Sequence, residues 1–191
     1  MVELIRTFIA VDFDNPEIVS RAQEVQRRLM ESGAVMKAVE PQNLHTTLWF
    51  FGELDRSRLQ LVLDNAKEIA FKAFKVNVKG VGYFPGGRRV NVIWLGIDDP
   101  TRGLSSIVEQ LRNRLTRLGF KYDERGFTPH LTIGRVKRVK DKVRLLKELD
   151  QLKEMVFGEQ IVDKFKVKKS TLTQRGSIYS DLLVVEARNG D

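Results

Sequence analysis

The chain has 191 residues, of which 42% are hydrophobic, and its formal net charge is +8. This composition can build a substantial core and argues against disorder, and the positive charge favours a polyanionic partner such as RNA, DNA, a nucleotide or an anionic membrane surface. Because the chain contains no cysteine, disulfides, thiolate nucleophiles and cysteine-based metal sites are excluded.

The N-terminal residues 1–6 lack the apolar core of a signal peptide. No apolar run approaches the roughly 20 residues needed to span a bilayer. We therefore expect a cytoplasmic protein without a membrane segment.

The first part of the chain predicts alternating strands and helices. An apolar, β-prone run at 6–13 predicts a strand, and Asn15 and Pro16 then suit the N-cap and first turn of a helix. Gly33 ends that helix, whose apolar stripe consists of Ile18, Ala22, Val25 and Leu29. The next expected elements are strands at 34–39 and 44–51, and Gly52 closes the second of them. A helix capped by Asp55 or Ser57 follows. Two further strands, at 74–81 and 90–97, are then joined by the turn 85–89.

The second part repeats this order. Helical spacing resumes after 98–101 and ends at Gly119, and the connection 121–128 leads into a strand at 129–136. A helix over 143–152 and strands at 161–170 and 178–187 complete the chain. The order strand, helix, strand, strand follows both His45 and His130, which suggests an internal duplication of one α+β unit. Since no linker separates the two units, we expect residues 1–191 to form a single bilobal domain.

The two histidines, which are the only ones in the chain, each begin the same short motif: His45-Thr46-Thr47-Leu48 and His130-Leu131-Thr132-Ile133. Residues i and i+2 of a strand share a face, so each strand presents one imidazole and one threonine hydroxyl, from Thr47 or Thr132. In a common cleft, the two imidazoles can act as general acid and general base at phosphorus, while the hydroxyls donate hydrogen bonds to its oxygens. This chemistry needs neither a metal nor a nucleotide cofactor, and two histidines without cysteine suit a metal poorly.

The two motifs, eighty-five positions apart, resemble those of the 2H phosphoesterase superfamily. Phe127, Pro129 and Arg135 around the second motif are similar to its RNA 2′,3′-cyclic phosphodiesterase branch, once named 2′–5′ RNA ligase. The resemblance covers essentially the whole chain. It implies a bilobal α+β fold in which two pseudo-symmetric antiparallel-sheet lobes, with outer helices, surround a central basic cleft.

The resemblance also implies an activity, namely metal-independent hydrolysis of an RNA 2′,3′-cyclic phosphate end to a 2′-phosphate. His45 would protonate the departing 3′-oxygen and His130 would activate water, while Thr47 and Thr132 bind the phosphate. Reversible 2′–5′ ligation would follow when a 5′-hydroxyl replaces water. We expect the partner to be RNA with a cyclic phosphate end, tRNA fragments included, and the protein to be a monomer.

Phe50 and Arg135 each lie five residues after a histidine, as do family residues that hold the terminal nucleotide. In a regular strand, an offset of five points to the opposite face from the histidine. Both side chains therefore reach the cleft only if a bulge or a strand end redirects them. For Phe50, a place in the core is an equal alternative.

Two other functions remain open at this point. One is 2H chemistry on a different substrate, such as a cyclic nucleotide, a tRNA-splicing intermediate or a 2′–5′ oligonucleotide. The other is a non-catalytic RNA-binding module. The two complete His-x-Thr triplets argue against the latter, because binding alone could use lysine or arginine there. The basic run at 164–169 predicts a strand with one solvated face before it predicts an RNA track.

Overall fold

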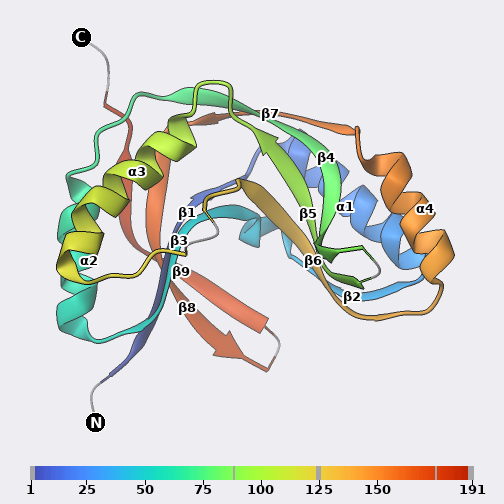
Figure 1. The fold of residues 1–191 in the computed structure, drawn as a ribbon, viewed down its shortest axis with the longest axis horizontal. Coiled ribbons are helices and arrows are strands. Elements are labelled where there is room, and N and C mark those ends of the chain that lie inside the picture. The colour runs from blue at the N-terminus through green and yellow to red at the C-terminus, as the bar shows by residue number, and fades with distance from the viewer. Residues whose placement is uncertain (1–2, 88, 124–125, 175, 189–191) are drawn as a thin grey trace.

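The computed structural model describes residues 3–87, 89–123, 126–174 and 176–188. Within them, the chain forms two antiparallel sheets with helices on their outer faces (Figure 1). The strands are β1 (Ile5–Asp12), β2 (Ala34–Ala38), β3 (His45–Leu54), β4 (Phe74–Gly86), β5 (Arg89–Asp98), β6 (His130–Val139), β7 (Val156–Val162), β8 (Lys164–Thr173) and β9 (Gly176–Glu186). The helices are α1 (Pro16–Glu31), α2 (Arg56–Lys67), α3 (Gly103–Leu115) and α4 (Lys142–Leu152), with 3₁₀ turns η1 (Pro41–Asn43) and η2 (Thr116–Leu118). The predicted α+β fold with two antiparallel-sheet lobes and outer helices is confirmed.

One sheet has the strand order β3-β1-β8-β9 and the other has the order β2-β6-β5-β4-β7. The chain crosses between them repeatedly. Helix α1 follows β1 but packs on β2, β6 and β7 of the other sheet, and α3 follows β5 but packs against β3 and α2. The lobes are therefore not consecutive halves of the sequence, because each sheet takes elements from both.

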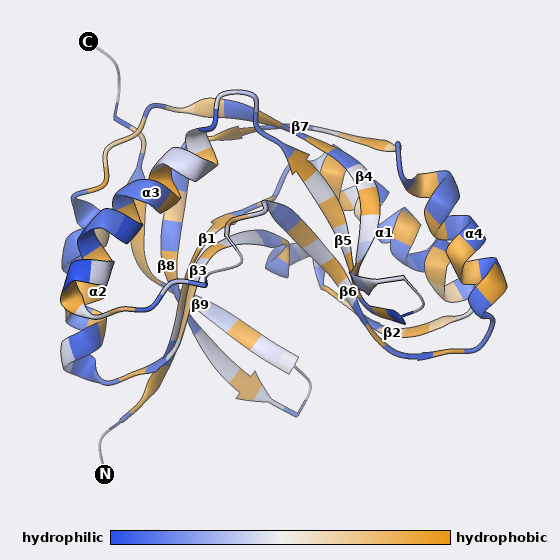
Figure 2. Ribbon diagram, in the orientation of Figure 1, coloured by the Kyte–Doolittle hydropathy of each residue, from blue (hydrophilic) through white to orange (hydrophobic). Residues whose placement is uncertain are grey.

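The helices begin where the sequence predicts. The Asn15 side chain accepts a hydrogen bond from the Glu17 amide at 2.9 Å, with Pro16 in the first turn, and Asp55 caps α2 by accepting from the Arg58 amide at 2.8 Å. The four stripe residues of α1 are buried as predicted. Figure 2 shows the same pattern in the other helices, whose hydrophobic stripes alternate with hydrophilic ones.

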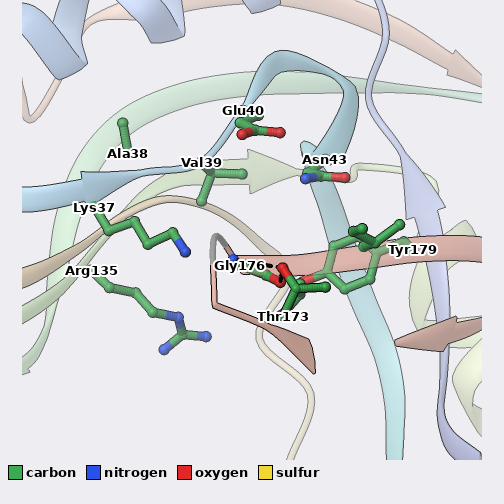
Figure 3. A pocket seen from close by; sticks show the side chains of 11 residues that line it. Lys37, Ala38, Val39, Glu40, Asn43, Arg135, Thr173, Gly176 and Tyr179 are labelled. Atoms are coloured by element: carbon green, nitrogen blue, oxygen red, sulfur yellow. Dashed lines mark hydrogen bonds between the residues drawn. The ribbon is translucent and has the colours of Figure 1, made fainter. Parts of the chain in front are cut away.

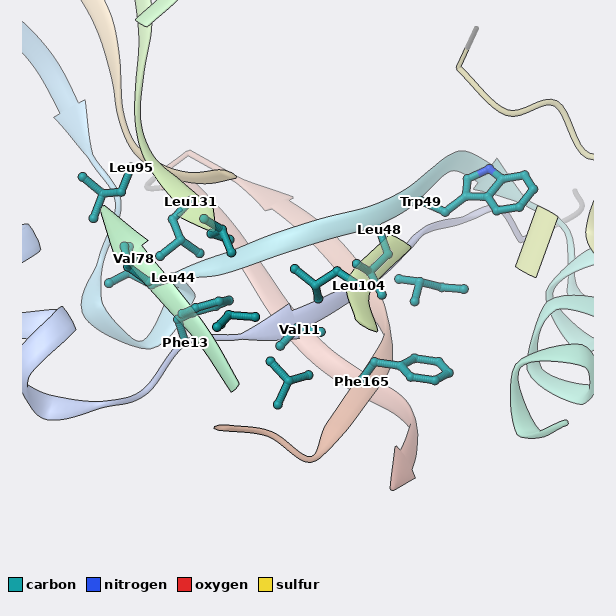
Figure 4. Packing of buried hydrophobic residues seen from close by; sticks show 14 of the residues in the cluster. Val11, Phe13, Leu44, Leu48, Trp49, Val78, Leu95, Leu104, Leu131 and Phe165 are labelled. Carbon is teal, nitrogen blue, oxygen red and sulfur yellow. The ribbon is translucent and has the colours of Figure 1, made fainter. Parts of the chain in front are cut away.

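Buried residues of both sheets belong to one continuous hydrophobic cluster. Figure 4 shows Phe13 and Leu44 close to Leu95 and Leu131, which come from the five-stranded sheet. Side chains as large as Phe13, at 1% exposure, contribute about 3 kcal/mol or more each to stability. The contact between the lobes is therefore part of the core.

The structure corrects two predictions about the limits of strands. Strand β3 continues past Gly52 to Leu54, with Gly52 at a φ of 76°. The strand predicted at 161–170 is two strands, β7 and β8, which divide at Asp163. Strand β7 lies at the edge of its sheet, and its apolar residues Val156 and Ile161 are exposed. Its sequence therefore lacks the clear alternation of apolar and polar residues by which a strand is predicted.

The order after His130 consequently contains one strand more than the order after His45, so the predicted duplication is inexact. In the predicted turn 85–89, β4 extends through Gly86 and β5 begins at Arg89, and Arg88 lies outside the described residues. No helix in the described part of the chain has the length and apolar content to cross a membrane.

Candidate active site

The two histidines open two strands that contact each other across the boundary between the sheets. His45 is the first residue of β3 and follows η1, and His130 is the first residue of β6. Both imidazoles are partly buried. The fold therefore brings together two motifs that are far apart in the sequence.

Each imidazole is oriented by the backbone carbonyl two residues before it. The Nδ1 atom of His45 lies 2.7 Å from the Asn43 oxygen, and Nδ1 of His130 lies 2.8 Å from the Thr128 oxygen. A carbonyl can only accept a hydrogen bond, so Nδ1 carries the hydrogen in both rings. In the neutral form, Nε2 of each ring is then the basic nitrogen that remains for proton transfer.

A β-bulge lies at the same place in both histidine strands. Ala10 and Ile9 of β1 pair with Thr47 and Trp49, so Leu48 is the extra residue in β3. Trp94 and Ile93 of β5 pair with Thr132 and Gly134, so Ile133 is the extra residue in β6. Each bulge lies three residues after a histidine.

The bulges explain how Phe50 and Arg135, each five residues after a histidine, can point to the same face of the sheet as that histidine. In β3, His45 and Thr47 are partly or fully exposed, Leu48 and Trp49 are both buried, and Phe50 is 50% exposed. The pattern in β6 is the same and ends with an exposed Arg135. A one-residue insertion reverses the side-chain alternation, so Phe50 and Arg135 return to the face of their histidines.

Aromatic rings surround both histidines. The His45 ring lies 5.2 Å from Phe8 and 5.3 Å from Tyr179, centroid to centroid. The His130 ring lies 5.4 Å from Phe84 and 6.2 Å from Trp94. These contacts exclude water from one side of each imidazole and fix its plane.

The lobes differ in the residue opposite the histidine. Asp12 of β1 pairs with His45, whereas Gly96 of β5 pairs with His130. A side chain at Gly96 would begin 2.6 Å from the Lys79 carbonyl oxygen, so the backbone of β4 excludes one there. At the position directly opposite the histidine, His45 therefore has a carboxylate and His130 has none.

Asp12 belongs to a partly buried network of two carboxylates and two ammonium groups. Lys168, with a side chain 7% exposed, lies 2.8 Å from Asp12 and 3.0 Å from Asp181. Lys166 lies 2.9 Å from Asp12 and 2.7 Å from Asp181. The basic run of β8 is thus partly internal, and the expected solvated face is wrong for Lys166 and Lys168.

Burial lowers the pKa of His45 below its ordinary value of 6.5. The hydrogen bond to the Asn43 carbonyl and the charge of Asp12 act in the opposite direction, while Lys168 and His130 add to the lowering. The charge of His130 is the smallest of these influences, and the two histidines begin strands β3 and β6, which contact each other.

Two cavities lie near the histidines, one lined by His130 itself and the other by Asn43 and Tyr179, which both contact His45. The larger, of about 710 Å³, is lined by Thr47, Phe50 and His130 and by aromatic residues including Phe84, Tyr122 and Phe127. The smaller, of about 360 Å³, is lined by Arg135 and Tyr179 among others. Thr132 lies between His130 and Arg135 in the sequence of β6, partly buried and paired with Trp94. Of the predicted residues, Phe50 shares a cavity with His130, and Arg135 lies in the other one.

Sequence reasoning missed Asp12, Phe84, Tyr179 and Lys37, which surround the site. Asp12 lies near the end of the predicted first strand, and only the pairing of β1 with β3 shows that it faces His45. Lys37 pairs with Arg135 across β2 and β6, a register that the sequence does not reveal. The described residues contain no group of three or more histidine, cysteine, aspartate or glutamate side chains that could hold a metal ion.

Comparison with known proteins places this geometry in a family. A family model described as the 2′-5′ RNA ligase superfamily matches residues 15–175. A Thermotoga maritima protein named RNA 2′,3′-cyclic phosphodiesterase is 38% identical over 97% of each chain. An Archaeoglobus fulgidus protein of the same name is 38% identical over 95% of this chain and 99% of its own.

Solved structures show the same fold. The TT0787 protein of Thermus thermophilus is 25% identical, with a TM-score of 0.82 over 98% of this chain and 100% of that one. Escherichia coli LigT is 24% identical, with a TM-score of 0.75 over 98% and 99% of the two chains. The paired histidine strands, the matching family model and the full-length relatives together show that the chain belongs to the 2′-5′ RNA ligase superfamily, the 2H phosphoesterases.

Proposed function

We propose that this protein hydrolyses RNA 2′,3′-cyclic phosphate ends to 2′-phosphates by a metal-independent, two-histidine mechanism. The observation that carries the proposal is the matched pair of imidazoles, each held through Nδ1 by the carbonyl two residues earlier. This arrangement leaves two equivalent Nε2 atoms for proton transfer. The relatives named RNA 2′,3′-cyclic phosphodiesterase support the choice of substrate.

In the proposed reaction, a water oxygen attacks phosphorus while the bond from phosphorus to the 3′-oxygen breaks. Nε2 of His130 takes the proton from water, and Nε2 of His45 gives its proton to the departing 3′-oxygen. Thr47 and Thr132 donate hydrogen bonds to the non-bridging oxygens, where negative charge develops. The phosphate remains on the 2′-oxygen, and the two histidines exchange protonation states.

The difference between Asp12 and Gly96 supports this division of roles. The Asp12 charge favours the protonated form of His45, which suits the general acid, while the corresponding position opposite His130 has no side chain. Burial acts against protonation of His45 in the free protein. A bound phosphate anion next to His45 raises its pKa again, so the acid is charged when the substrate is present.

The same residues can catalyse 2′–5′ ligation. If a 5′-hydroxyl takes the place of water, His130 removes its proton and the product is a 2′–5′ phosphodiester. No additional group is required for this step. Both histidines come from one chain, so a monomer contains the complete site.

The test is incubation of the purified protein, with EDTA present, with a short RNA that ends in a 2′,3′-cyclic phosphate. The products are then separated into 2′-phosphate, 3′-phosphate and unreacted ends. Formation of the 2′-phosphate supports the reaction, its regiochemistry and its independence of metal. Reaction of small cyclic nucleotides alone would indicate a different 2H substrate, and tight RNA binding without reaction would indicate a binding module.

A further inference from the structure

The smaller cavity contains two positive charges at directly opposed positions. Lys37 of β2 pairs with Arg135 of β6, and both side chains line the cavity. Figure 3 shows both side chains on the same side of the cavity, extending toward Thr173 of β8 and Gly176 of β9. Like charges directly opposite each other in a sheet repel, so their placement here favours a role in binding an anion.

The Arg135 guanidinium is available to such an anion. Within the residues that the structure describes, no carboxylate forms an ion pair with Arg135. Glu40, which also lines the cavity, accepts a hydrogen bond from the Gln42 amide at 2.7 Å. A bound anion would lower the repulsion between Lys37 and Arg135 and gain a charge-assisted hydrogen bond from the guanidinium.

The β8–β9 hairpin closes the cavity from the other lobe. A Cβ atom at Gly176 would lie 2.6 Å from Nζ of Lys37, so the missing side chain at Gly176 leaves room for the ammonium group. The Thr173 hydroxyl joins the ends of the two strands, because it accepts a hydrogen bond from the Gly176 amide at 3.1 Å and donates one to the Gly176 carbonyl at 2.7 Å. The cavity is therefore a formed space between two lobes.

The cavity lies on the His45 side of the reaction centre. It is lined by Tyr179, whose ring contacts His45, and by Asn43, whose carbonyl orients it. In the proposed reaction, His45 protonates the 3′-oxygen of the terminal ribose, so that ribose stands next to this cavity. The group that joins the terminal ribose to the rest of the RNA is the phosphate on its 5′-oxygen.

We propose that Lys37 and Arg135 bind the phosphodiester on the 5′ side of the terminal nucleotide, so that the enzyme distinguishes an RNA end from a cyclic mononucleotide. The proposal rests on the proposed function of the same site. Lys37 and Arg135 then form a second phosphate subsite, beside the one that the histidines and threonines form.

The experiment compares kcat/KM for three compounds: adenosine 2′,3′-cyclic phosphate, the same compound with a 5′-phosphate, and the ApA dinucleotide with a 2′,3′-cyclic phosphate end. We expect the 5′-phosphate to raise kcat/KM by about tenfold, mostly through KM, since hydrogen bonds to a charged group have about this effect. The dinucleotide should show a similar gain. Both gains should decrease at higher salt.

The variants separate this subsite from a general effect of charge. Lys37→Ala should reduce the ratio between the phosphorylated and unphosphorylated mononucleotides to about threefold or less, and Lys37→Arg should retain it. Lys147→Ala, which removes the same charge from the exposed face of α4, should leave the ratio at its original value.

A ratio near one in the original protein, or a ratio that Lys37→Ala does not lower, would overturn the subsite. A gain for the dinucleotide without a gain for the 5′-phosphorylated mononucleotide would overturn it too, because the contact would then be with the second nucleoside. If none of the three compounds reacts with the original protein, the proposed function itself fails.

Discussion

Asp12 lies directly opposite His45 where β1 pairs with β3, and its negative charge raises the pKa that burial of the imidazole lowers. Asp12 is also held by Lys166 and Lys168, so its position is fixed by ion pairs as well as by the strand. In the proposed reaction, the carboxylate would therefore act through the histidine.

The pH profile should show this effect. A general acid loses its function as pH rises through its pKa, and burial places the pKa of His45 below 6.5 in the free protein. The alkaline limb of kcat/KM should therefore begin below pH 6.5, and that of kcat should lie at higher pH, because the bound phosphate raises the pKa. Measurement of both profiles between about pH 4.5 and 8.5, in about half-unit steps, tests this order. Coincident limbs would contradict it.

Asp12→Asn should move the alkaline limb of kcat/KM to lower pH. Loss of the carboxylate removes the charge that favours protonated His45, while Lys168 continues to disfavour it. Asp181→Asn is the matched control, since it removes the same charge from the same network without pairing with His45. An equal shift in both variants would show that the network as a whole, and not Asp12, sets the pKa.

His45→Asn and His130→Asn should each lower turnover by about 10²–10⁴-fold, which is the usual effect of losing one positioned acid or base. The affinity for RNA with a 2′-phosphate end should change far less, because neither imidazole is needed to hold the rest of the RNA. Single-turnover rates and equilibrium binding measure the two quantities separately. Parallel loss of binding and turnover would instead indicate a folding or binding role.

Phe50→Ala should raise KM about tenfold or more with little change in kcat. Phe50 lines the larger cavity, and the Arg6 guanidinium lies 4.7 Å from its ring centroid, which supports one face of the ring. Stacking of a base on an aromatic side chain contributes about 1–3 kcal/mol. Phe50→Trp should retain the original KM, and Leu61→Ala, another exposed apolar residue, serves as the control. Unchanged KM in Phe50→Ala would place Phe50 outside the nucleotide site.

Lys168→Met should destabilise the fold by about 3 kcal/mol, because it leaves Asp12 and Asp181 with one ammonium group in a partly buried place. Lys164→Met, at an exposed lysine of the same strand, should change stability by about 0.5 kcal/mol or less. Urea unfolding curves of the two variants provide the comparison. Equal stability of both variants would mean that solvent screens the network.

The sequence predicted those parts of the fold and site that local patterns encode. Asn15 and Pro16 marked the start of α1 because capping depends on neighbouring residues. The paired motifs of His45 and His130 indicated the chemistry because both triplets use the same two-residue period. Strand pairings carry no such local mark, so the places of Asp12 and Lys37 became known only from the register of β1 with β3 and of β2 with β6.

The bulges illustrate the same limit at the scale of one residue. Leu48 and Ile133 are ordinary apolar strand residues, and nothing in them distinguishes an inserted residue from a paired one. Whether a residue is paired or inserted depends on the neighbouring strand, which is β1 for Leu48 and β5 for Ile133. For this reason, the sequence could state that Phe50 and Arg135 needed a bulge but could not say whether one exists.

The crossing of the chain between the lobes has a consequence for how far the two histidine strands can separate. Helices α1 and α3 each cover the sheet that does not contain the preceding strand, and one core joins both sheets. The lobes therefore cannot part like the halves of a hinge without unfolding, and the spacing of the two imidazoles is set before any substrate arrives. In the proposed reaction the site is therefore preorganised, and an RNA end binds to imidazoles whose relative positions the core has already set.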